Sequence, residues 1–156
     1  LYNGSFEAPL TNLGFDWIVQ KHPAVSLDTA STYDTSGERA LRVSFRGLRV
    51  QFQHLHQYLM LPPGDYTLQG RVRPDKLQAA QGMQWALYCV GNNAPLAVSD
   101  RVRGSEPWTR FRTAFSIPRD SCPVQMLRLE LAGTIRLDFD AIGTVWYDNL
   151  AIERVR

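Results

Sequence analysis

Two carboxylates near opposite ends of the chain are the residues best placed to act together. The run Asn3-Gly4-Ser5-Phe6-Glu7 opens the first segment expected to be a strand, and the last such segment contains Asp148. A β-sandwich would lay these terminal strands side by side. We therefore expect Glu7 and Asp148 at matching, neighbouring positions.

Catalysis would require a carboxylate pair across a cleft or a nucleophile with a positioned base. Asp138 with Asp140, or Asp16 with Glu130, could form such a pair. Asp138 and Asp140, however, lie in a Gly-bounded segment before the last strand, where solvated loop carboxylates are expected. The chain also lacks a Gly-x-Ser-x-Gly elbow, a Walker loop and a Gly-x-Gly-x-x-Gly motif. We expect a protein that is not an enzyme.

The two cysteines offer a covalent link. Cys89 lies in an expected strand, and Cys122 lies in a loop just before Pro123. No Cys-x-x-Cys or His/Cys spacing indicates zinc, so the alternatives are free thiols or one disulfide. A disulfide closing this loop would stabilise the fold by roughly 3 to 4 kcal/mol. We favour the disulfide, and with it an extracytoplasmic location: periplasmic, cell-surface or secreted.

Length and composition bound the remaining possibilities. A chain of 156 residues, 44% of them hydrophobic, is long enough for one substantial core, so residues 1–156 are expected to form a single domain. Because the chain starts at Leu1, we expect it to be excised from a larger protein. Its apolar runs end well before the roughly 20 residues of a membrane-spanning helix. The formal charge is only +2, and the arginines are dispersed along the chain rather than gathered in one run. This pattern does not favour nucleic acid as a partner.

Alternation of apolar and polar residues predicts an all-β fold. The expected strands span residues 41–45, 49–61, 66–72, 83–90, 109–117, 125–132 and 144–155. Turn residues such as Pro62-Pro63-Gly64-Asp65 separate them. Residues 74–82 are the only plausible helical turn. About eight strands without long helices fit a jelly-roll β-sandwich of two antiparallel sheets.

Several motifs along the chain fall in a familiar order. They are Asn3-Gly4-Ser5-Phe6-Glu7, residues 37–45, residues 61–68, Trp108-Thr109-Arg110-Phe111 and Trp146-Tyr147-Asp148-Asn149. Their order and spacing resemble the galactose-binding-like jelly roll, specifically the carbohydrate-binding modules of families 4, 9 and 22. The resemblance covers essentially the whole chain, and it supports the fold more strongly than any ligand.

The resemblance also implies a structural calcium ion, held between the first strand, the loop before the third and the final strand. Carried over motif by motif, the ligands would be the carboxylates of Glu7 and Asp148 with backbone carbonyls near Ser5 and Arg39. Calcium takes six to eight oxygen ligands, which this set and water would provide. In the alternative interpretation Glu7 pairs with an arginine and Asp148 caps a turn.

By the same analogy, the ligand would bind the concave sheet formed by residues 49–61, 83–90 and 125–132. The candidate ligand-binding residues are Trp17, Gln53, Gln84, Tyr88, Arg128 and Glu130, with Gln51 beside them. Tyr88 and Trp17 are the candidates for stacking on sugar rings, although Trp17 fits a core position at least as well. His54 and His56, on one strand face without a third ligand nearby in sequence, are expected to be surface or groove residues.

Two functions follow from these expectations. The first is a non-catalytic module that binds a glycan or polysaccharide. The alternative is a structural or protein-interaction domain, with a protein partner in the cell envelope. The thin row of exposed aromatic residues and the many arginines on strand faces agree with the alternative.

Overall fold

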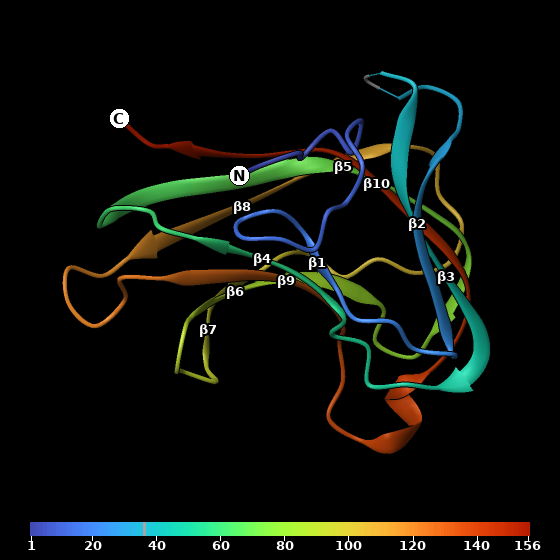
Figure 1. The fold of residues 1–156 in the computed structure, drawn as a ribbon. Helices are drawn as coiled ribbons and strands as arrows, with labels where there is room; N and C mark the ends of the chain where they lie inside the picture. Colours follow the sequence, from blue (N-terminus) through green and yellow to red (C-terminus); the bar gives the residue numbers. More distant parts are fainter. Residues whose placement is uncertain (36) are drawn as a thin grey trace.

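Two five-stranded antiparallel sheets packed face to face make up the computed structural model, which describes residues 1–35 and 37–156 (Figure 1). Sheet A has the order β1 (Ile18–Val19), β4 (Leu55–Leu59), β9 (Gln125–Leu131), β6 (Met83–Cys89) and β7 (Pro95–Val98). Sheet B has the order β2 (Val25–Ser31), β3 (Arg39–Arg49), β10 (Asp140–Arg154), β5 (Gly64–Ala79) and β8 (Thr109–Ile117). The all-β sandwich predicted from the sequence is confirmed.

The core lies between the inner faces of the two sheets, where side chains from alternate strand positions meet. Met83, Trp85 and Leu87 of β6 point inward and are fully buried. The ring of Trp85 lies 5.3 Å, centroid to centroid, from the ring of Tyr147 on the opposite sheet. Burying large aromatic side chains in this way is a major source of the stability of a sandwich.

The sequence prediction of a helical turn at residues 74–82 is wrong. β5 continues through this region to Ala79, and Pro74 pairs in register with Val145 of β10. Pro74 lacks an amide hydrogen, but its carbonyl accepts a hydrogen bond from Glu106 N at 3.2 Å. Within the part of the chain that the structure describes, the helical segment is instead η1 (Arg136–Phe139), a 3₁₀ turn before β10.

Two other expected strands differ from the observed elements. The strand expected at residues 49–61 is divided, because β3 ends at Arg49 in sheet B and β4 begins at Leu55 in sheet A. Residues 3–7 form a turn rather than a strand, with positive φ at Asn3 and Phe6. The turn still lies beside the last strand, since Leu150 N donates to Gly4 O at 2.9 Å.

The predicted disulfide is confirmed. Cys89 at the end of β6 is bonded to Cys122 in the loop before β9, with their Cα atoms 5.1 Å apart. The link fixes the loop to the rim of sheet A. No helix among the described residues is long and apolar enough to cross a membrane.

Candidate functional site

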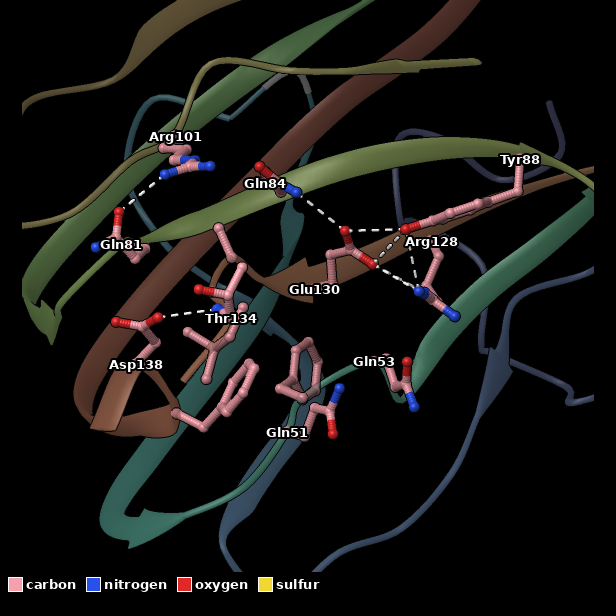
Figure 2. A pocket seen from close by; sticks show the side chains of 15 residues that line it. Gln51, Gln53, Gln81, Gln84, Tyr88, Arg101, Arg128, Glu130, Thr134 and Asp138 are labelled. Atoms are coloured by element: carbon pink, nitrogen blue, oxygen red, sulfur yellow. Dashed lines mark hydrogen bonds and ion pairs between the residues drawn. The ribbon is translucent and has the colours of Figure 1, made fainter. Parts of the chain in front are cut away.

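A hollow with a volume of about 470 Å³ lies on the outer face of sheet A, and we call it the groove (Figure 2). Polar side chains dominate its walls. They include Gln51, Gln53, Gln81, Gln84, Tyr88, Arg101, Arg128, Glu130, Thr134 and Asp138. Five of the six predicted ligand-binding residues, together with Gln51, are therefore gathered in one place.

Strand alternation explains how β6 and β9 supply the centre of the groove. Gln84 and Tyr88 occupy outward positions of β6 and alternate with the inward residues Met83, Trp85, Leu87 and Cys89. In the β6–β9 register Gln84 lies opposite Glu130. Ala86, the outward residue before Tyr88, lies opposite Arg128, so Tyr88 and Arg128 are diagonal neighbours. Directly opposed and diagonal side chains of an antiparallel pair are close enough to interact.

Glu130 is the hub of a hydrogen-bond network in the groove. Its carboxylate accepts from Gln84 Nε2 at 2.9 Å, from the Tyr88 hydroxyl at 3.0 and 3.1 Å, and from Arg128 Nη2 at 2.8 Å. A second Arg128 bond, from Nε, measures 3.0 Å. Bonds to a charged acceptor are stronger than neutral ones, so this network holds four side chains in fixed positions.

Tyr88 is not the open stacking platform that the sequence suggested. Its side chain is buried, and the Arg128 guanidinium lies over its ring with the Arg128 Cζ atom 4.6 Å from the ring centroid. Burial raises the pKa of the Tyr88 phenol, and the negative charge of Glu130 raises it further. The hydroxyl is therefore a neutral hydrogen-bonding group at physiological pH.

Gln84 carries an oxygen without a partner. Its side chain is 7% exposed, its Nε2 is engaged by Glu130, and its Oε1 makes no hydrogen bond to any described residue. A buried acceptor left in this state costs free energy. This oxygen has almost no accessible surface, so the Gln84 side chain must shift before a donor in the groove can reach it.

The far end of the groove is built from loop residues. Asp138 accepts from Thr134 N at 2.9 Å and Ile135 N at 3.1 Å, and these bonds lower the pKa of its carboxyl. Asp138 is buried, so the prediction of a solvated loop carboxylate is wrong for this residue. Arg101 Nη1 donates to Gln81 Oε1 at 2.9 Å and places a cation at the groove wall.

Trp17, the sixth predicted ligand-binding residue, lies in the core. It has no exposed surface, stacks on Phe6 at 5.5 Å between ring centroids, and donates from Nε1 to Asn3 O at 3.1 Å. The core interpretation left open by the sequence is therefore the correct one. Trp17 ties the N-terminal turn to the sandwich and offers no face to a ligand.

Sequence reasoning missed the loop residues Gln81, Arg101 and Thr134, and it treated Asp138 as a solvated carboxylate, since strand alternation says nothing about loops. Tyr58, a residue 36% exposed on β4 and outside the groove lining, was also missed. The Tyr58 ring lies 5.0 Å, between centroids, from that of His56. The alternation of Leu55, Gln57 and Leu59 with two outward aromatic rings was the signal that could have found it.

The segments expected to hold calcium contact one another through Gly4 and Leu150 and through Glu7 and Arg39. The Glu7 carboxylate accepts from Arg39 N at 3.0 Å and from Glu38 N at 3.2 Å. A side chain at Gly37 would collide with the Glu7 carboxylate, so this backbone forms a close cradle around it. Asp148 is fully buried and accepts from Asn149 N at 2.8 Å. No group of three or more His, Cys, Asp or Glu side chains in the described ranges could hold a metal.

Comparison of the fold with solved structures finds carbohydrate-binding modules. The chain superposes on a family 4 carbohydrate-binding module with a TM-score of 0.68 and 13% identity, covering 98% of each chain. It is also similar to the CBM22-1 xylan-binding domain of Paenibacillus barcinonensis Xyn10C, with a TM-score of 0.61, 18% identity, and 98% and 92% coverage. No protein-family model and no curated protein sequence matches the chain.

A third similar structure is a Stig cyclase from Fischerella sp., with a TM-score of 0.63, 15% identity, and 100% and 97% coverage. At these identities the likeness concerns the fold. The chain thus has the jelly-roll fold of carbohydrate-binding modules, which confirms the resemblance indicated by the sequence motifs. The same fold also carries cyclases, so function must be argued from the groove.

Proposed function

We propose that the chain is a non-catalytic carbohydrate-binding module whose groove on sheet A binds a glycan. The observation that carries this proposal is the unpartnered, buried Oε1 of Gln84 in the wall of a polar groove. A sugar hydroxyl donates a hydrogen bond and would satisfy that oxygen once the Gln84 side chain shifts to expose it. The Glu130 network fixes the surrounding groups in advance, which lowers the entropic cost of binding.

The chemistry of the groove favours a ligand recognised mainly by hydrogen bonds. Amide groups of Gln51, Gln53 and Gln81 line it and offer both donors and acceptors to hydroxyls. Arg128 covers the Tyr88 ring, so stacking contributes less than hydrogen bonding. A segment of a hydroxyl-rich polysaccharide fits this surface.

The two groove carboxylates are poorly suited to catalysis. Glu130 accepts hydrogen bonds from three side chains, and Asp138 caps two backbone amides. A general base needs a free lone pair directed at the substrate proton. Both carboxylates are committed to the structure, which supports a binding role rather than an enzymatic one.

A glycan array in calcium-containing buffer, repeated with a chelator, tests the proposal. The expected result is saturable binding to one glycan family. The groove is then tested by calorimetry with Gln84→Ala and Arg128→Ala, which should each weaken binding by about tenfold or more. Gln20→Ala, an exposed glutamine outside the groove, is the matched control.

A blank array on folded protein would reject glycan binding and favour the alternative, a structural or protein-interaction domain of the cell envelope. Unchanged affinity in both groove variants would reject the site while retaining the function. The disulfide supports an extracytoplasmic location for either role, because such bonds persist in oxidising compartments.

We also propose a structural calcium ion held by Glu7 and Asp148 with carbonyls near Ser5 and Arg39. The donor set consists only of oxygen atoms, which suits a hard cation. Contacts of Gly4 with Leu150, and of Glu7 with Arg39, support it by bringing these segments together. When bound, calcium would cross-link the N-terminal turn to the final strand.

A further inference from the structure

A second hollow, of about 450 Å³, lies on the outer face of sheet B between β5 and β8. We call it the arginine hollow. It is lined by Gln69, Gly70, Arg71, Arg110, Phe111, Arg112 and Asn149. Because sheets A and B form opposite layers of the sandwich, this surface is separate from the groove (Figure 1).

The register of β5 and β8 brings three guanidinium groups to the hollow. Arg110 lies directly opposite Arg71, and Arg112 lies opposite Gln69. Arg110 and Arg112 are two residues apart on one strand, so their side chains leave the sheet on the same face. Like charges directly opposite one another destabilise a sheet.

The positive charge of the hollow is largely uncompensated. Within the described chain, the side chains of Arg110 and Arg112 make no hydrogen bond or ion pair. No acidic residue of the described ranges lines the hollow, and the nearby Glu153 carboxylate accepts from Gln69 Nε2 at 3.0 Å. Arg71 bonds to the carbonyl of Asp34 at 2.6 Å and to its carboxylate at 3.1 Å. The Arg71 guanidinium also lies 5.0 Å from the centroid of the Trp108 ring, which fixes its position.

The arrangement suits a compact anion better than a long one. Arg110 and Arg112 leave the same face of β8 and line the hollow beside Arg71, so a group with several terminal oxygens can accept from both of their guanidiniums. The Asp34 side chain, 72% exposed and paired with Arg71, would repel a long acidic chain that extended in its direction. Nucleic acid, which needs an extended basic track with stacking aromatic rings, fits poorly for the same reason.

We propose that the arginine hollow binds the tetrahedral oxyanion of a sulfated or phosphorylated sugar. The inference that an oxyanion binds depends on the arginine positions alone. The inference that a sugar carries this oxyanion rests on the proposed function. The two parts are separable, because inorganic sulfate and phosphate test the first without the second.

The test follows the side-chain Nε–Hε NMR signals of the arginines while ligands are added at constant ionic strength. The ligands are inorganic sulfate, inorganic phosphate, glucose 6-sulfate and glucose 6-phosphate, with glucose and glucuronate for comparison. The expected result is saturable movement of the Arg110 and Arg112 signals with an oxyanion ester. The stronger of the two esters identifies its source as sulfate or phosphate.

Arg110→Gln and Arg112→Gln should each weaken ester binding by about tenfold. Arg119→Gln, an exposed arginine in the loop after β8, removes the same charge elsewhere and should leave binding unchanged. Equal losses of ester affinity in all three variants would show that binding depends only on net charge, and would overturn the proposed site. Binding of glucuronate as tight as that of the esters would overturn the tetrahedral assignment.

The groove gives an independent reference. Gln84→Ala should leave ester binding intact, since Gln84 belongs to sheet A. If no oxyanion, free or esterified, moves the arginine signals, the hollow is rejected while glycan binding in the groove is untouched. If inorganic sulfate or phosphate binds but neither ester does, the sugar part is overturned.

Discussion

Under the proposed function, Gln84 is a residue placed for binding at the expense of stability. Its unpartnered Oε1 is buried, whereas a methionine of similar size would place no polar atom there. Gln84→Met removes the unpartnered oxygen together with the Nε2 bond to Glu130, so we expect a small change in melting temperature, and a loss of about tenfold in glycan binding. Thermal denaturation and calorimetry measure the two effects. A loss of stability without a loss of affinity would contradict this role.

His54 and His56 make stability depend on pH. Burial lowers the pKa of both imidazoles, and the neighbouring His22 and Arg128 respectively lower it further. The unfolded chain therefore binds protons at a higher pH than the folded chain. Stability is complete above the unfolded value of 6.5 and is lost as the pH falls below it.

Urea unfolding at pH 7 and pH 5 checks this expectation. The window lies above the usual carboxyl range of about 4, so aspartates contribute little to it. His54→Gln should reduce the difference between the two pH values, while Gln20→Ala should leave it unchanged. Equal stability of the parent protein at both pH values would refute the prediction.

At the scale of elements, the disulfide ties β6 to the loop before β9. Its two cysteines are 33 positions apart. Replacing both with serine should lower the free energy of unfolding by roughly 3 to 4 kcal/mol, mainly because the unfolded chain regains entropy. Chemical denaturation of the double variant measures the loss. A change below about 1 kcal/mol would show that the unfolded chain is restricted by other means.

The connection from β2 to β3 is held on sheet B by Arg73. The Arg73 Cζ atom lies 4.6 Å from the ring centroid of Tyr33, 5.2 Å from that of Trp146 and 5.6 Å from that of Trp108. Its Nη2 donates to Thr32 Oγ1 at 2.8 Å. A planar guanidinium stacks on several rings at once, whereas an ammonium does not.

Arg73→Lys keeps the charge and removes the stacking, so we expect a loss of about 1 to 2 kcal/mol in unfolding free energy. Arg46→Lys, on the same face of sheet B, is the control, because Arg46 has no ring partner among the described residues. Equal effects of the two substitutions would show that stacking on Arg73 adds nothing to stability.

Strands with regular alternation were predictable from the sequence, and the exceptions have physical causes. The expected strand at residues 109–117 matches β8, and those at 83–90 and 125–132 match β6 and β9 within one residue. The helical turn predicted at residues 74–82 was wrong because Pro74 favours a break in an isolated chain, whereas pairing of β5 with β10 continues the strand past it. Tertiary pairing overrode the local preference.

The groove residues show the same contrast between regular strands, which were predictable, and loops, which were not. Gln84, Arg128 and Glu130 were found because alternation places them outward on β6 and β9. Asp138 was misjudged because its burial depends on the fold of a loop against the sheet. Trp17 was ambiguous because an aromatic residue in a loop suits both a core and a groove.

At the scale of the whole molecule, the proposed calcium ion would join the two ends of the chain. A ligand that binds only the folded state stabilises it by about 2.7 kcal/mol at one hundred times its dissociation constant. We therefore expect a chelator to lower the melting temperature, measured by scanning calorimetry. Glu7→Gln should reduce this sensitivity, and Glu153→Gln, a glutamate outside the site, should not. A melting temperature unaffected by the chelator would refute the proposed calcium site.

The last strand of the chain occupies the middle of sheet B, between β3 and β5 (Figure 1). During synthesis, every strand of sheet A is complete once residue 131 has been made, but β3 and β5 still lack the partner that lies between them. The inner apolar face of sheet A has no complete layer to cover it until β10 emerges. Domains fold as units during translation, and exposed apolar surfaces aggregate meanwhile. We therefore expect nascent chains of this domain to expose the apolar face of sheet A until the final segment has been synthesised.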